Sequence, residues 1–136
     1  MAPSANVHDR LRAICLGLPD VVEVVSHGES TFRYRDRQFA MNASADNHHG
    51  NGRPAAWIKA EPANQQFMVK ARPDRFFVPP YVGPQGWIGM WLDRRVSWRE
   101  VRELVTDGYR LIEARKKPNG ARVPRPGPGR RTRPGS

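Results

Sequence analysis

STFRYRDRQFAMNAS, residues 30–44, decides the fold of this 136-residue chain. Apolar Phe32 and Tyr34 alternate with polar and basic residues, and Asp36-Arg37 supplies a polar turn before apolar residues resume. A period of two is typical of a strand with one buried face, and two such runs around a polar turn form a hairpin. The stretch therefore predicts a β-hairpin with one apolar face and one arginine-bearing face.

Shorter segments on both sides of this hairpin extend the predicted sheet. VVEVVS (21–26) precedes it and AAWIKAE (55–61) follows it, and both have the composition of strands. GWIGMWLD (86–93) has apolar residues on both sides, which favours a central strand. Between these segments, ADNHHGNGRP (45–54) is predicted to be a loop because it is rich in Gly, Asn and Pro.

Three further segments have helical patterns. Apolar residues at helical spacing predict a first helix over residues 7–18, and PANQQFMVKA (62–71) predicts a second helix with Pro at its first position. The capping box SWRE (97–100) opens a third, which runs to about residue 115. The expected order is helix, three or four strands, helix, strand, helix. This order predicts an α+β domain, an antiparallel sheet with one face covered by the terminal helices.

The net charge of +10 is unevenly distributed. Residues 1–115 hold 16 Lys and Arg against all 13 Asp and Glu, whereas residues 116–136 hold seven basic residues and no acid. The end of the chain is also rich in Pro and Gly, so it cannot bury enough apolar surface to offset the entropy cost of ordering. We expect one domain over residues 1–117 and a disordered basic tail over residues 118–136.

Other features exclude several classes of protein. Cys15 is the single cysteine, so no intramolecular disulfide forms, and its place on the apolar side of the first helix indicates a core residue. No apolar run approaches the ~18 residues of a membrane span. Residues 1–10 contain no apolar stretch that resembles a signal peptide. We expect a cytoplasmic protein with no membrane partner.

Three stretches together resemble the MmcQ/YjbR-like family of small bacterial proteins: SHGESTFRYRDRQFAMNASADNHHGNGRPAAW (26–57), RPDRFFVPPYVGPQGWIGMWLD (72–93) and SWREVRELVTDGYRLIEARKK (97–117). RFFVPPYVGPQGWIG (75–89) is the most specific of the matching blocks, although Gln85 stands where many relatives carry His. The resemblance implies a fold similar to CyaY/frataxin, with an antiparallel sheet flanked by two helices in a double-wing topology. It also implies DNA binding through two β-hairpin wings. It carries over no catalytic residue, and fold similarity alone does not imply iron binding.

The leading functional hypothesis is nucleic-acid binding, with DNA as the partner. Arg33, Arg35 and Arg37 lie two residues apart, so in one strand they would project from one face at ~7 Å intervals and contact phosphates. Arg94 and Arg95 belong to a second basic cluster before the last helix. The basic tail would add affinity that depends on salt and not on sequence. In the competing interpretation the hairpin arginines only form a solvated face of the sheet, with Asp36 and Glu29 as local partners.

The alternative hypothesis is a protein that binds or sequesters a small molecule. Its pocket would combine His27, His48 and His49 with Tyr81 and Trp87 of the aromatic-proline loop, because imidazole and aromatic walls suit small ligands. The histidines lack metal-ligand spacing, and no nucleophile elbow or phosphate loop is present. The sequence therefore predicts no catalytic residue, metal or cofactor and argues against an enzyme. A third hypothesis is a protein-interaction module.

Overall fold

The computed structural model describes residues 3–45, 52–93 and 95–116. Its elements follow one another in this order: α1 (Pro3–Leu16), β1 (Val21–Ser26), β2 (Glu29–Tyr34), β3 (Arg37–Ala43), β4 (Ala55–Ile58), α2 (Pro62–Ala71), β5 (Phe76–Phe77), the 3₁₀ turn η1 (Gly83–Gln85), β6 (Ile88–Trp91) and α3 (Trp98–Lys116). Within this part of the chain, no helix has the length and apolar character that crossing a membrane requires. The predicted α+β class is confirmed.

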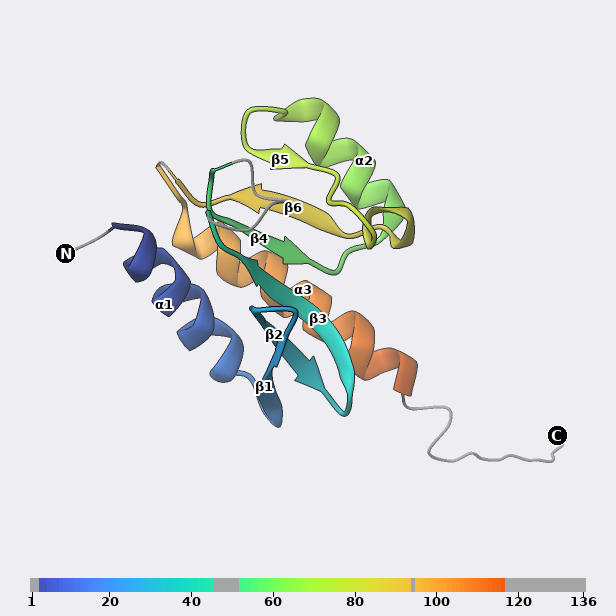
Figure 1. Ribbon diagram of the computed structural model, residues 1–136. Coiled ribbons are helices and arrows are strands. Elements are labelled where there is room, and N and C mark those ends of the chain that lie inside the picture. The colour runs from blue at the N-terminus through green and yellow to red at the C-terminus, as the bar shows by residue number, and fades with distance from the viewer. Residues whose placement is uncertain (1–2, 46–51, 94, 117–136) are drawn as a thin grey trace, which may run out of the picture.

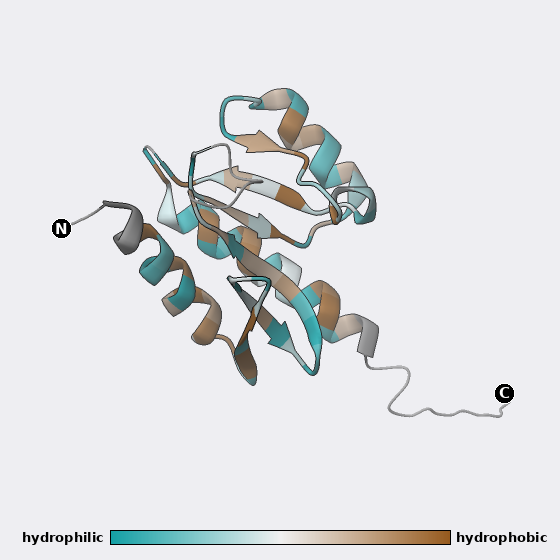
Figure 2. Cartoon of the chain, viewed as in Figure 1, coloured by the Kyte–Doolittle hydropathy of each residue, from teal (hydrophilic) through white to brown (hydrophobic). Residues whose placement is uncertain are grey.

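The strands form one antiparallel sheet in the order β1-β2-β3-β4-β6-β5. Helices α1 and α3 lie together on one face, as predicted for the terminal helices, while α2 lies beside β5 (Figure 1). Hydrophobic residues recur along α1 and α3 among hydrophilic ones, which is the pattern of helices that cover a core with one side (Figure 2). The main core lies between these helices and the sheet, and its fully buried members include Leu11, Phe32, Phe39, Val101 and Val105.

A second, smaller cluster lies on the opposite face of the sheet. Ala43, Ala55, Trp57 and Trp87 form its buried centre. The cluster is tied to α2 by the buried Gln65, whose Nε2 donates to the carbonyl oxygens of Gly83 at 2.8 Å and of Trp87 at 2.7 Å. Apolar residues on both faces of β6 thus have a physical cause, since β6 is an interior strand covered on both sides.

A β-bulge shapes the central hairpin. The register between β2 and β3 shifts between Phe32 and Arg33, so β3 holds one extra residue. As a result, the consecutive residues Phe39 and Ala40 are both buried in the main core. Strict alternation in the sequence could not show this shift.

Several elements differ from the expected boundaries. Helix α1 begins and ends earlier than the expected 7–18, and β4 ends at Ile58 instead of residue 61. Strand β5 was not expected, because two residues carry no periodicity. Strand β6 begins at Ile88 instead of Gly86, since Gly86 adopts a left-handed φ of 99° and ends the 3₁₀ turn η1.

The strand register defines two ends of the sheet. At one end lie the Arg35–Asp36 turn, the end of β4 at Ile58 and the start of β6 at Ile88; we call it the arginine end. At the other lie the His27–Gly28 turn, the start of β4 at Ala55 and the end of β6 at Trp91; we call it the histidine end. These two ends locate the candidate site residues.

Candidate nucleic-acid interface

The β2–β3 hairpin ends in a two-residue turn made by Arg35 and Asp36. Both residues have positive φ, 51° and 70°, and the pairing of Tyr34 with Arg37 closes the turn. Two successive positive φ values are the requirement of a type I′ turn. The turn thus lies one residue earlier than the predicted Asp36-Arg37. The prediction that Arg33, Arg35 and Arg37 project from one strand is also wrong, because they lie in β2, in the turn and in β3 respectively.

None of the three hairpin arginines makes an ion pair within the described ranges. Arg35 and Arg37 are exposed, and the half-buried Arg33 donates from Nε to Thr31 Oγ1 at 3.1 Å. Elsewhere, four arginines pair with carboxylates at N–O distances between 2.6 and 3.6 Å: Arg12 with Glu23, Arg53 with Asp93, Arg72 with Glu100, and Arg99 with Glu103. The hairpin therefore presents cations whose charge no described carboxylate neutralises by direct contact.

Aromatic packing fixes the base of this hairpin on α3. The ring of Tyr109 meets those of Tyr34 and Phe39 edge to face, with centroid distances of 5.2 and 5.6 Å. The Tyr109 hydroxyl donates to the carbonyl oxygen of Pro19 at 2.9 Å. Burial, and after it the negative charge of Glu113, raises the pKa of Tyr109 above its ordinary value, so the hydroxyl keeps its proton at neutral pH. The base of the hairpin that carries the arginines is thus packed against α3.

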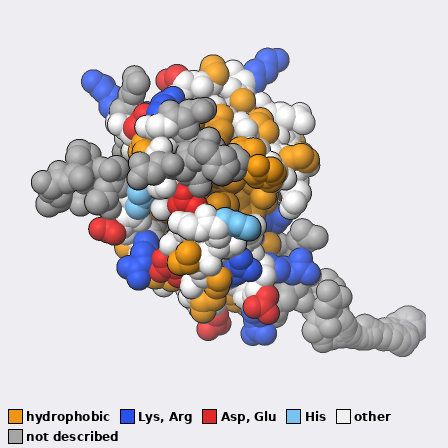
Figure 3. All heavy atoms as spheres, in the orientation of Figure 1, with side chains coloured by type: hydrophobic (Ala, Val, Ile, Leu, Met, Phe, Trp, Pro, Cys, Tyr) orange, Lys and Arg blue, Asp and Glu red, His pale blue; other side chains and the backbone are white. Residues whose placement is uncertain are grey.

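Helix α3 leads toward the same end of the sheet. A Cβ atom at Gly108 would lie only 2.7 Å from the carbonyl oxygen of Lys59, so glycine is what allows this close approach of the helix to β4. From Tyr109 under the hairpin, the helix continues to Lys116. The end of α3 and the β2–β3 turn both lie at the lower right of Figure 1, and Lys and Arg side chains, mixed with acidic ones, lie in the lower part of Figure 3.

The basic tail begins where α3 ends. Residues 117–136 hold six of the chain's 23 Lys and Arg residues and no acid. They lie outside the described residues, so their predicted disorder and the domain boundary at residue 117 stay predictions.

The second predicted basic cluster lies at the histidine end. Arg94 is outside the described residues, and Arg95 is exposed in the connection that leads from Trp91 to α3. Trp91 pairs with Ala55 at the end of the sheet opposite to the Arg35–Asp36 turn. The structure therefore does not bring Arg95 together with the hairpin arginines.

The structure also separates residues of the predicted small-molecule pocket. His27 is exposed in the turn at the histidine end, whereas Tyr81 is 73% exposed in the loop before Ile88, at the arginine end. Trp87 is only 2% exposed and packs within the second cluster, so the structure does not present it beside the exposed His27 as a pocket wall. His48 and His49 lie outside the described residues.

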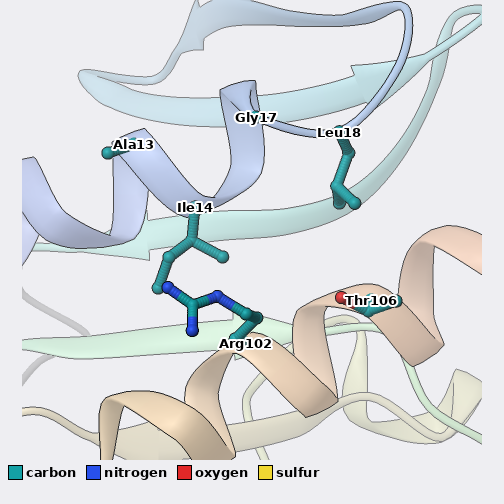
Figure 4. Close-up of a pocket in the computed structure, with 6 residues that line it drawn as sticks. All are labelled: Ala13, Ile14, Gly17, Leu18, Arg102 and Thr106. Carbon is teal, nitrogen blue, oxygen red and sulfur yellow. The ribbon is translucent and has the colours of Figure 1, made fainter.

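In the part of the chain that the structure describes, hollows lie beside the helices instead, including two against α3. One, of about 360 Å³, lies between α1 and α3, where Arg102 reaches toward Ile14 (Figure 4). The other, of about 270 Å³, lies between α3 and the start of α2, and both signs of charge line it, with Lys59 and Arg110 beside Glu61 and Asp107. Of the predicted pocket residues that the structure describes, His27, Tyr81 and Trp87, none lines either hollow. The amphipathic patterns that predicted the helices could not indicate the space between them.

Two other residues singled out in the sequence lie in the interior. Burial raises the pKa of the Cys15 thiol far above its ordinary value, so this residue behaves as a core side chain. Glu29 is 5% exposed and accepts hydrogen bonds from the Ser44 backbone N–H at 3.0 Å and the Ser44 hydroxyl at 2.9 Å. Glu29 therefore fastens β2 to the residue that follows β3, and the expectation that Glu29 is a solvated partner of the hairpin arginines is wrong. No group of three metal-binding side chains occurs among residues 3–45, 52–93 and 95–116.

Fold and site together define a small α+β protein whose sheet is covered by two helices and carries an arginine-tipped hairpin. Residues 16–111 match the family model described as YjbR, and the chain belongs to the YjbR family. The crystal structure of the Deinococcus radiodurans protein DR2400, described as a DUF419 domain, is similar with a TM-score of 0.66 and 20% identity over 77% of each chain. At this identity the likeness concerns the fold alone. No curated protein matches the chain.

Proposed function

We propose that this chain binds nucleic acid, with DNA as the first partner to test, through the β2–β3 hairpin and the basic tail. One observation carries the proposal: Arg33, Arg35 and Arg37 have no carboxylate partner in the described ranges, whereas four arginines elsewhere do. Guanidinium groups in and beside an exposed turn suit phosphate, because a guanidinium without a carboxylate partner can donate two parallel hydrogen bonds to phosphate oxygens.

The backbone at the tip supports the same function. Arg35 has a φ of 51°, a conformation that costs a residue with a side chain ~1 kcal/mol or more. Asn or Gly would fit the first position of a type I′ turn better. Contact between the Arg35 guanidinium and a ligand would account for an arginine at this strained position of the turn.

The tail and the hairpin supply different parts of the affinity. The basic residues of the tail attract any polyanion, independent of its sequence. The hairpin provides cations at fixed positions, which set the orientation of the protein on the phosphate backbone of the nucleic acid. Both contributions fall with salt, since each phosphate neutralised on duplex DNA contributes about 0.9 to the slope of log K against log salt.

Anisotropy titrations of a labelled DNA duplex at several salt concentrations test this proposal. The wild-type chain is compared with three full-length variants. The first replaces Arg33, Arg35 and Arg37 with Ala; the second replaces the six basic residues of 117–136 with Gln. The third is a charge-matched control that replaces the paired Arg12, Arg72 and Arg99 with Ala.

We expect the hairpin variant to lose about tenfold or more in affinity and about 2 to 3 from its salt slope. The control variant should lose much less, although its net charge is the same. If the control loses as much as the hairpin variant, or if only the tail variant loses affinity, the chain is a general polycation and the hairpin proposal fails.

A further inference from the structure

The two edges of the sheet differ in how they are protected. Strand β5 has only two residues, and Pro79 and Pro80 follow it closely without an N–H to donate to another strand. Strand β1 has six residues, VVEVVS, with no Pro and no Lys. Natural proteins normally blunt such an edge with charge, proline, a bulge or a cover. The β1 edge has no proline and no bulge, and Glu23 is its single charge.

Strand β1 is also apolar and exposed. Val22, Val24 and Val25 have exposed fractions of 54%, 39% and 67%, and the strand stands out as hydrophobic in Figure 2. Its only described strand partner is β2. A long, exposed, hydrophobic edge is a template for pairing with another strand.

The single charge on β1 does not discourage pairing. Glu23 accepts a hydrogen bond from the Ser30 hydroxyl at 2.6 Å and forms an ion pair with Arg12 Nε at 2.7 Å. The carboxylate is therefore neutralised within its own chain, and a second strand would meet no unpaired charge there.

We infer that β1 pairs antiparallel with β1 of a second copy of this chain, joining the two sheets edge to edge. In an antiparallel pair, opposed residues have their side chains on the same face of the sheet. In a symmetric dimer, the two-fold axis therefore passes between one residue of β1 and the same residue of the second copy. With Val24 opposite its own copy, Glu23 faces Val25 and Val22 faces Ser26. This register keeps the two Glu23 carboxylates from standing directly opposite each other, a placement that would be destabilising.

The antiparallel arrangement keeps the cationic hairpins of the two copies apart. In the antiparallel pair, the arginine end of one copy lies beside the histidine end of the other. The two cationic hairpins therefore occupy diagonally opposite corners of the joined sheet, although each chain has a net charge of +10. A foreign peptide would need side-chain pockets or complementary charges for specificity, and β1 presents four valines, one serine and a neutralised acid.

Sedimentation velocity of the full chain without nucleic acid tests the inference, in salt high enough to screen repulsion between the copies. We expect the mass to rise from one copy toward two with concentration. Val24→Lys places two cations together on the axis and should leave a single copy. Phe67→Lys is the matched control, since Phe67 is a 70% exposed residue on α2, and it should behave as wild type. A single copy at all concentrations, or an unchanged dimer in Val24→Lys, overturns the inference.

Cross-linking tests the register. Opposed residues have Cβ atoms about 4.5–5.5 Å apart, close enough for a disulfide to form after small adjustment. Under mild oxidation Val24→Cys should give covalent dimers faster than Phe67→Cys, and the buried Cys15 does not compete. Equal rates for the two variants overturn the inference. Both experiments are independent of DNA binding, so their failure would leave the proposed function intact.

Discussion

Two hairpins of this molecule share strand β2 and end in turns with the same backbone geometry but different chemistry. The β1–β2 turn is His27–Gly28, with φ values of 53° and 81°, and the β2–β3 turn is Arg35–Asp36, with 51° and 70°. Gly at the second position suits a type I′ turn, whereas Arg-Asp is a poor choice for it. Turn stability therefore explains Gly28 in the first turn, but it does not explain why Arg35 and Asp36 occupy the second.

The two hairpins also differ in their ion pairs. The β1–β2 hairpin is fastened to α1 by Arg12 and Glu23, and its carboxylate and guanidinium satisfy each other. The β2–β3 hairpin keeps three arginines without such a partner in the described residues. We therefore assign a structural role to the first hairpin and a binding role to the second, and three predictions test this division.

The largest expected effect is on DNA affinity when the first residue of each turn becomes Asn. Arg35→Asn should weaken binding about threefold to tenfold and reduce the salt slope by about 0.9, because one phosphate contact is lost. Its stability should not fall, since Asn tolerates a left-handed backbone better than Arg. His27→Asn is the matched control and should leave affinity unchanged. Equal losses in the two variants, measured by anisotropy, would contradict the division of roles.

A smaller effect is expected on stability when the second residue of each turn is changed. A Cβ atom at Gly28 meets nothing within 4 Å, so Gly28→Ala adds only backbone strain and should lower the free energy of unfolding by about 1 kcal/mol. Asp36→Gly relieves strain and should raise it by a few tenths of a kcal/mol. Urea unfolding measures both changes. A neutral Gly28→Ala would show that the turn does not hold its left-handed conformation.

Much of this architecture could be predicted from local sequence patterns. The 62–71 helix has its predicted bounds because Pro62 suits the first turn and Pro73 prevents continuation. Strand β1 matches VVEVVS, and the terminal helices cover one face of the sheet as expected. These features depend on periodicity and on residues that start or stop helices, which act over a few residues only.

The rest depends on pairing between distant segments. The turn at Arg35–Asp36 and the bulge beside Phe32 follow from how β2 aligns with β3, and no local signal marks either one. Trp87 is buried because its side of the sheet holds Trp57, which lies thirty positions earlier in the chain. An alternating aromatic pattern identifies a strand but does not show which face is covered.

The smallest expected effect concerns acid sensitivity of the β1–β2 hairpin. The hydrogen bond from Ser30, followed by that from Arg12, lowers the pKa of Glu23 below its ordinary value. A carboxylate with a lowered folded-state pKa stabilises the fold above its ordinary pKa, and this contribution is lost as pH falls through the folded-state value. Between about pH 6 and pH 3, the melting temperature of the wild type should therefore fall further than that of Glu23→Gln, by about 2–4 °C at most for so exposed a pair.

The hairpin arginines provide the contrast for this measurement. Arg33, Arg35 and Arg37 have no carboxylate partner in the described residues, so replacing them with Ala should leave the acid sensitivity of the wild type intact. Their contribution should respond to salt in the presence of DNA instead. If Glu23→Gln is as acid-sensitive as the wild type while the triple Ala variant is less so, the structural and binding roles are assigned to the wrong hairpins.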